Sequence, residues 1–315
     1  MVADREAAHL APFEGHDERY GAKEKFFGDK AERISREEYP AVVKELVAKA
    51  AGHFQRLEPH EQLEDKEDFG DVDFVALAGD GVEDGEGFFR KIFGADLLDY
   101  HHEKAAPGKE NVLYTLLVKL SSGKQVQVDV TKAKSEEDFE RKKTYYSRGH
   151  LSSFIGVVAK NLGFTYGTEG FFKKYCDSKG QWHNILITGD LKTGLKVLGY
   201  DTAAYESVKT LDDCLAFLTS SPYFDSRYFD QKNMVRRDKE ALRRSTQQQY
   251  LRGKLPRDQR QKLKDEKELQ TEIEERLGEL LPGWDEAYRR ETERIEAEIA
   301  RRAAERRRRL AALDK

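Results

Sequence analysis

Residues 70–77 read GDVDFVAL, and this short stretch decides how the chain is interpreted. The apolar run within it predicts a short buried strand. Side chains two residues apart on a strand project from the same face, so Asp71 and Asp73 would lie side by side while Val72 and Phe74 enter the core. Two carboxylates this close repel each other unless a cation lies between them. The pair is therefore a candidate metal ligand set, although a chain with 59 acidic residues can also contain such a pair by chance.

The clearest structural signal in the sequence is NVLYTLLVKL-SSG-KQVQVDVTK at residues 111–132. Two β-rich runs flank a Ser-Ser-Gly turn, which predicts a hairpin. The second run alternates, so its valines share one face and Asp129 lies on the other with two glutamines. If this strand pairs beside the strand of Asp71 and Asp73, three carboxylates converge at one edge of the sheet.

Three converging carboxylates would suit divalent metal ions. Hard ions such as Mg²⁺ prefer oxygen ligands and usually take one or two carboxylates together with substrate phosphates. Two such ions about 3.5–4 Å apart can activate an attacking oxygen and neutralise a leaving pyrophosphate. The sequence therefore predicts a site for two Mg²⁺ ions, with Mn²⁺ as an alternative, formed by Asp71, Asp73 and Asp129.

A helix is predicted just upstream, in ISREEYPAVVKELVAKAAGHF at residues 34–54. Ser35 and Glu38 have the spacing of a capping box, and Gly52 can end the helix in the left-handed conformation. A glycine also lets the backbone approach phosphates, and Arg56 offers a forked donor to them. A helix end followed by a surface arginine explains these two residues equally well.

Together, GHFQR, GDVDFVAL and VQVDV resemble the motif of the nucleotidyltransferase superfamily built around a DNA polymerase beta-like palm. That motif reads Gly-Ser-aromatic-x-Arg, then Asp-x-Asp on a strand, then a third Asp on a later strand. The segment at residues 142–172 resembles the part of X-family polymerases that lines the nucleotide sugar, and residues 183–201 resemble the stretch that closes their thumb. The resemblance covers about residues 33 to 205.

The resemblance implies roles for individual residues. Asp71, Asp73 and Asp129 would hold two Mg²⁺ ions, and Asp129 would favour deprotonation of an attacking 3′-hydroxyl. The sequence departs from the family in having His53 where a serine is usual, a long stretch between Gly52 and Asp71, and an arginine where a glycine is common. The residues implied to bind the nucleotide are Gly52, His53 and Arg56 for the triphosphate, and Tyr145, Tyr146, Ser147 and Arg148 for the sugar and base.

The expected fold is α+β: a nucleotidyltransferase (polymerase beta-like) palm sheet with helices, a small α/β thumb-like region and long C-terminal helices. Two helices separated near residues 147–150 are expected, followed by short strands in FTYGTEGFFKKY and HNILIT and by two further capped helices. A break in the C-terminal helices is expected at Pro282-Gly283. The predicted domains are a loosely ordered lead-in (1–30), the palm (31–140), the thumb-like region (141–235) and a charged helical tail (236–315).

Charge is distributed unevenly along the 315 residues. Residues 236–315 contain 23 basic and 18 acidic residues, whereas the first 235 residues are net acidic. The dense cluster RRAAERRRRL at residues 301–310 can bind a phosphate backbone without sequence preference, but acids precede it, and a coiled-coil or helical-hairpin surface for self-association is an equal alternative. Arg141, Lys142 and Lys143 are either phosphate contacts or a solvated helix face. Trp182 and Trp284 are expected to be packing residues.

The N-terminal residues contain no apolar signal region, no run approaches membrane-spanning length, and the two cysteines form no disulfide framework, which predicts a soluble intracellular protein. The predicted activity is transfer of a nucleoside monophosphate from an NTP or dNTP to a hydroxyl, with a DNA or RNA 3′ end as the expected acceptor. Transfer to a protein or small molecule, and a non-catalytic scaffold of the same fold that assembles through its tail, are the alternatives.

Overall fold

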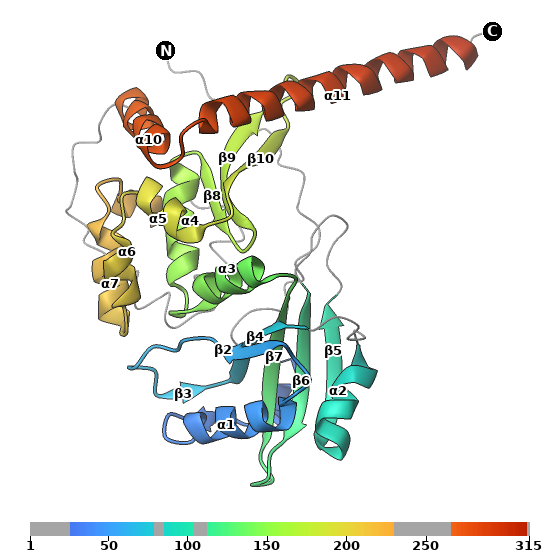
Figure 1. Ribbon diagram of the computed structural model, residues 1–315, viewed down its shortest axis with the longest axis vertical. Helices are drawn as coiled ribbons and strands as arrows, with labels where there is room; N and C mark the ends of the chain where they lie inside the picture. Colours follow the sequence, from blue (N-terminus) through green and yellow to red (C-terminus); the bar gives the residue numbers. More distant parts are fainter. Residues whose placement is uncertain (1–25, 79–84, 104–111, 230–265, 314–315) are drawn as a thin grey trace.

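The computed structural model describes residues 26–78, 85–103, 112–229 and 266–313 (Figure 1). Most of the predicted lead-in, the acidic loop at residues 79–84 and the first part of the predicted tail, up to residue 265, lie outside the described residues.

A five-stranded mixed sheet forms the lower half of the molecule in Figure 1, in the order β2-β4-β7-β6-β5. The predicted hairpin is confirmed as β6 and β7, which pair antiparallel. The expected pairing of β7 beside β4 is also confirmed, and these two central strands run parallel. The strands are β2 (Arg56–Pro59), β4 (Asp71–Leu77), β5 (Leu97–Glu103), β6 (Leu113–Lys119) and β7 (Gln125–Ala133).

Helices cover both faces of this sheet. On one face, α1 (Tyr39–Ala50) and α2 (Glu86–Phe93) pack against the valines of β7 and the apolar side chains of β4. On the other face, Phe139 of α3 (Glu136–Tyr146) packs against Val75 and Leu77, near the carboxyl end of β4. The amino end of β4 on that second face is where its two aspartates lie.

The predicted end of α1 is confirmed, but its predicted N-cap is wrong, because Glu38 and not Ser35 is the N-cap and the helix begins at Tyr39. The Ser35 amide donates to Glu38 Oε2 at 2.9 Å, and the Glu38 amide donates to Ser35 Oγ at 3.3 Å. The helix ends at Ala50, and Gly52 has a φ of 78°, the left-handed conformation that favours glycine. The Ser35–Glu38 hydrogen bonds therefore precede the helix, which begins three residues later than the sequence predicts and ends where it predicts.

The stretch between Gly52 and Asp71 is not a plain loop, and this corrects the sequence interpretation. It contains β2, which pairs with β4, and β3 (Asp68–Phe69), which pairs with β1 (Ile34–Ser35). The sequence of β2 is RLEP, which lacks the alternating apolar pattern that predicts a strand. All four of its residues are half-buried. Helix α2 and strand β5 were likewise not predicted from the sequence.

The upper half of the molecule contains a separate three-stranded antiparallel sheet and its own apolar cluster. The two helices expected around residues 147–150 are confirmed as α3 and α4, and FTYGTEGFFKKY forms two strands that turn at Gly167–Gly170. The elements are α4 (Leu151–Asn161), β8 (Phe164–Gly167), β9 (Gly170–Cys176), β10 (Trp182–Thr188), α5 (Leu191–Val197), α6 (Thr202–Glu206) and α7 (Leu211–Ser220). Short 3-10 helices lie at η1 (Gly28–Lys30), η2 (Gly94–Asp96) and η3 (Ser226–Phe229).

Two C-terminal helices complete the described chain, α10 (Glu266–Leu280) and α11 (Trp284–Leu313), with the predicted break between them. Ile273 and Leu277 of α10 are fully buried in the upper cluster. Early in α11, the Tyr288 hydroxyl donates to the Lys174 carbonyl at 3.0 Å, whereas the end of the helix projects away from the body (Figure 1). Within the described residues, no helix is both long and apolar enough to cross a membrane.

Two expectations about individual side chains are wrong. Trp182 is not a packing residue, because it lies on the edge strand β10 and is 57% exposed. The basic run of α3 is also not the solvated helix face that was one of its two alternatives: Lys143 pairs with Glu58 at 2.5 Å, Arg141 with Asp138 at 2.7 Å, and Lys142 is buried.

The buried Lys142 is satisfied by Asp138 one helical turn earlier. Its Nζ donates to Asp138 Oδ2 at 2.8 Å and to the Lys132 carbonyl at 2.5 Å, which ties α3 to the end of β7. Burial alone would raise the pKa of Asp138, but the hydrogen bond and charge of Lys142 outweigh it and lower that pKa. This buried ion pair therefore attaches α3 to the sheet.

Replacing Asp138 with asparagine should reduce the free energy of unfolding by about 3–5 kcal/mol, because Lys142 would then be a buried cation without its anion. The lowered pKa of Asp138 means that its contribution is present above about pH 4 and is lost as the pH falls through the folded-state pKa. Denaturant unfolding at neutral and acidic pH measures both effects.

Glu137→Gln is the matched control, because Glu137 is an exposed carboxylate on the same turn of α3. Equal stability of the Asp138 and Glu137 variants at neutral pH would contradict this assignment.

Candidate metal centre

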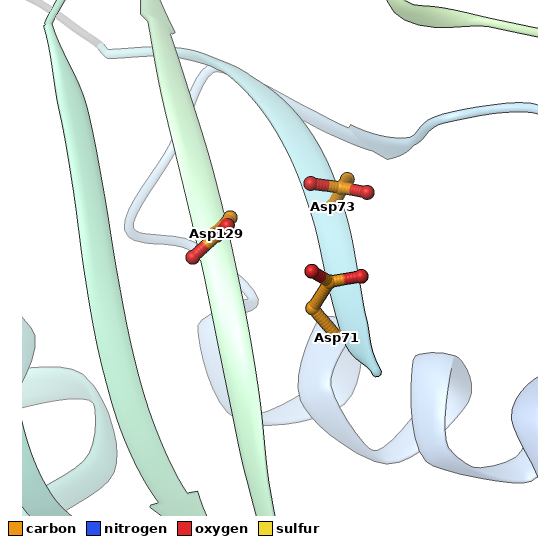
Figure 2. A group of neighbouring side chains, drawn as sticks. All are labelled: Asp71, Asp73 and Asp129. Carbon is orange, nitrogen blue, oxygen red and sulfur yellow. The ribbon is translucent and has the colours of Figure 1, made fainter. Parts of the chain in front are cut away.

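The parallel pairing of β4 with β7 brings the three predicted carboxylates together. Asp73 is directly opposite Asp129, and Asp71 is opposite Gln127. Each of the three aspartates offers an oxygen within 4.8 Å of the others. Figure 2 shows them on the two neighbouring strands. The convergence predicted from the alternation of each strand is therefore present.

The carboxylates lie on the sheet face that also carries α3, but beyond the part that this helix covers. Further along the same face of β4, Val75 and Leu77 are buried against Phe139. The three aspartates are only half-buried, and the Asp73 side chain is 33% exposed. The site is thus walled by the sheet and open to solvent on one side.

Crowding makes the site electrostatically unfavourable without a cation. Burial raises the pKa of Asp73. Burial, reinforced by the negative charges of Asp73 and Asp71, raises the pKa of Asp129 well above its ordinary value. The side-chain amide of Gln127 donates to Asp129 Oδ1 at 3.2 Å and partly offsets this effect. A divalent cation would remove the repulsion and keep the carboxylates ionised.

His60, which was not among the predicted site residues, lies beside the carboxylates. Its amide donates to the Asp73 carbonyl at 2.9 Å, and its Nδ1 lies 4.0 Å from Asp73 Oδ2. Burial lowers the pKa of His60 to about 4, so the ring is neutral at pH 7. Because β2 was not predicted, no signal indicated that the residue following it would meet Asp73.

Tyr146 contacts His60 and so lies near the aspartate site. The two rings are stacked with their centroids 5.2 Å apart and their planes 3° apart, and Tyr145 lies edge-on to Tyr146 at 5.3 Å. Tyr145 packs against the upper apolar cluster. Tyr146 is therefore connected to the aspartate site indirectly, through His60, which lies beside Asp73.

Ser147 and Arg148 hold a neighbouring loop. Ser147 Oγ accepts from the Glu61 amide at 3.4 Å, and the Arg148 guanidinium pairs with Glu61 at 3.0 Å and with Glu206 at 3.4 Å. Arg148 is buried, and its φ of 64° lies in the region that favours glycine. These contacts show Arg148 tying the β2–β3 connection to the upper half of the molecule.

The structure does not bring Arg56 to the aspartates. It pairs with Leu77 in the sheet, four residues beyond Asp73, or about 13 Å along the strand. Its guanidinium lies 4.0 Å from the centre of the Phe139 ring and forms salt bridges with three carboxylates. Those partners are Glu58, Glu136 and Glu140.

Gly52 and His53 precede Arg56 and lie further from the site along the chain. His53 contacts Phe88 of α2 edge-on, with the ring centroids 6.3 Å apart. Gly52 serves as the left-handed end of α1. The three residues expected to bind the triphosphate are thus placed at the opposite end of β4 from the site.

The donor set fits a hard divalent cation. Three carboxylates supply several oxygen ligands, the open side leaves room for water and phosphate oxygens, and the described part of the site contains no thiolate that would favour a softer metal. Asp71, Asp73 and Asp129 are the residues that could hold such ions.

No protein-family model and no curated protein sequence matches this chain. Among solved structures, Leishmania infantum polymerase beta in a ternary gap complex is similar with a TM-score of 0.34 and 17% sequence identity. That similarity covers 47% of this chain and 53% of the polymerase chain, so it spans about half of each.

Replacing Asp129 with asparagine should stabilise the metal-free protein and abolish its response to metal. The neutral amide removes one of three repelling carboxylates, so the free energy of unfolding in chelator should rise by about 1 kcal/mol. Saturating Mn²⁺ should stabilise the wild type by about 2.7 kcal/mol at 100 times Kd, but the variant only slightly. Thermal unfolding with and without Mn²⁺ measures both.

Asp99→Asn is the control, because Asp99 is a half-exposed carboxylate on β5 of the same sheet. Since metal binding requires ionised carboxylates and the pKa values of Asp73 and Asp129 are raised, the stabilisation by Mn²⁺ should shrink as the pH is lowered from about 8 to about 5. A metal response that is unchanged in Asp129→Asn would refute the site.

Proposed function

We propose that this protein is a metal-dependent nucleotidyltransferase that transfers a nucleoside monophosphate from a nucleoside triphosphate to a hydroxyl group. The observation that carries the proposal is the convergence of Asp71, Asp73 and Asp129 on two parallel strands, with one oxygen of each within 4.8 Å of the others. The motif resemblance of the same three residues supports this class over a structural metal site, as does the open side of the half-buried cluster.

The three aspartates would hold two Mg²⁺ or Mn²⁺ ions, which when bound supply Lewis-acid activation of the acceptor hydroxyl and stabilisation of the leaving pyrophosphate. Asp73 and Asp129 face each other from neighbouring strands, so they are suited to share one ion. Asp129 would favour deprotonation of the acceptor hydroxyl. The neutral His60 would position Tyr146 beside the nucleotide sugar through their stacked rings.

A nucleic-acid 3′ end is the acceptor we propose. The support is the end of α11, where residues 301–309 contain six arginines and one glutamate and are mostly exposed. Salt bridges with Glu298 and Glu305 involve Arg301, Arg302 and Arg309. Within the described residues, no carboxylate lies within salt-bridge distance of Arg306, Arg307 or Arg308, and an exposed cationic helix of this kind attracts a phosphate backbone.

Purified protein should extend or label a 3′-hydroxyl acceptor when supplied with Mg²⁺ or Mn²⁺ and radiolabelled nucleotides. The assay should include single-stranded and primed DNA and RNA, each of the four NTPs and dNTPs, and a reaction without added acceptor to detect labelling of the protein itself. Asp71→Ala and Asp129→Ala should each reduce the rate at least about 100-fold, because each removes a ligand of the reacting ions.

Asp99→Asn is again the control and should retain the wild-type rate. Labelling of the protein or a small molecule, with none on nucleic acid, would replace the proposed acceptor but keep the proposed chemistry. No transfer to any acceptor by a wild-type protein that binds Mn²⁺ would refute the catalytic proposal and favour a non-catalytic role.

Replacing Arg306, Arg307 and Arg308 together with alanine should weaken binding to a labelled single-stranded oligonucleotide and flatten its salt dependence. For every phosphate that the variant no longer neutralises, the slope of log K against log salt should fall by about 0.7. Fluorescence anisotropy at several salt concentrations measures this slope. Arg294→Ala is the control because Arg294 already pairs with Glu291 at 2.6 Å, and an unchanged slope in the triple variant would exclude this surface.

A further inference from the structure

The connection between β2 and β3, residues 60–67, is held firmly beside the aspartates. At its start, the His60 amide is bonded to the Asp73 carbonyl at 2.9 Å. The Glu61 carbonyl accepts from the Arg148 amide at 3.0 Å, and the Glu64 amide donates to the Lys209 carbonyl at 2.7 Å. Leu63 is buried in the upper apolar cluster. The side chains of this segment are therefore presented from a fixed backbone.

Lys66 stands at the end of this segment, five residues before Asp71. Its Nζ lies 4.6 Å from the centre of the Phe69 ring and donates to Gln62 Oε1 at 3.4 Å. The Phe69 ring is itself buried and stacked on Tyr39, with centroids 4.0 Å apart.

The segment that carries Lys66 flanks the aspartates at both of its ends. His60, at its start, has its Nδ1 4.0 Å from Asp73 Oδ2. Phe69, over whose ring the Lys66 ammonium lies, is two residues before Asp71. The Lys66 side chain is therefore presented from a segment that borders the carboxylates.

Lys66 differs from the other cations near this face in having no anionic partner. Arg56 and Lys143 form salt bridges with Glu58, and Arg33 pairs with Asp68. Within the described part of the chain, no carboxylate lies within salt-bridge distance of Lys66. Its two contacts, a long hydrogen bond to a neutral amide and an aromatic face, are weak enough to be exchanged for a stronger anionic partner.

We infer that Lys66 binds the phosphates of the incoming nucleotide, in place of the triphosphate contact that the sequence motif assigned to Arg56. This inference rests on the proposed function. A lysine ammonium is a compact charge that recognises phosphate oxygens from several directions, so it can follow the triphosphate without a fixed bidentate geometry. Phe69 and Gln62 would hold the side chain near its binding position and reduce the entropy lost when the nucleotide binds.

Equilibrium binding of nucleotides in the presence of Mn²⁺ tests this role apart from turnover. The measurement compares a non-hydrolysable NTP analogue with the corresponding NMP for wild type and Lys66→Met. The variant should bind the triphosphate about 10- to 100-fold more weakly, because a charge-assisted hydrogen bond is lost, and the monophosphate nearly as well as the wild type. Lys66→Arg keeps the charge and should restore most of the triphosphate affinity.

Lys209→Met is the matched control, because Lys209 lies next to the same loop but its side chain is exposed and paired with Glu64. Thermal unfolding verifies that each variant is folded. Equal triphosphate affinity of Lys66→Met and wild type overturns the inference, as does a selective loss in Arg56→Met instead. Failure of the wild type to bind any nucleotide, despite binding Mn²⁺, rejects the proposed function and this inference with it.

Discussion

Parallel pairing of β4 with β7 is the constraint on which the candidate site depends. Because side chains directly opposite each other on neighbouring strands share a face, the pairing of Asp73 with Asp129 brings two carboxylates together, and Asp71 joins them from two residues along the strand. A shift of one residue in this register would place Asp129 on the opposite face. The buried valines of β7 oppose that shift, since it would expose them to solvent.

The two faces of the sheet therefore have different roles. One face is covered by α1 and α2, and the burial of its apolar side chains stabilises the register between β4 and β7. The other is covered by α3 only towards the carboxyl end of β4, and the carboxylates occupy the uncovered end. The Asp138–Lys142 pair fastens α3 in its position. The stability of the sheet thus supports a cluster of like charges that is unfavourable without a cation.

Contacts between the two halves of the molecule surround this cluster. Arg148 joins Glu61 to Glu206, Tyr146 stacks on His60, and Leu63 enters the upper apolar cluster. In the segment expected to contact the nucleotide sugar, some residues hold the two halves of the molecule together and others, such as the half-buried Tyr146, are accessible. Arg148 holds the halves together, because its buried guanidinium contacts the carboxylates of Glu61 and Glu206 and the Tyr205 ring.

The sequence by itself determined the elements whose signals are local. The reciprocal Ser35–Glu38 hydrogen bonds, the glycine end of α1, the β6–β7 hairpin and the alternation that places Asp129 on the face opposite the valines all depend on residues a few positions apart. Only the tertiary structure decided which strand each element joins. The short β2 has no periodic pattern, yet its pairing with β4 moves Arg56 to the far end of the strand and brings His60 to Asp73. Such register is set by contacts between distant residues, so no local pattern reveals it.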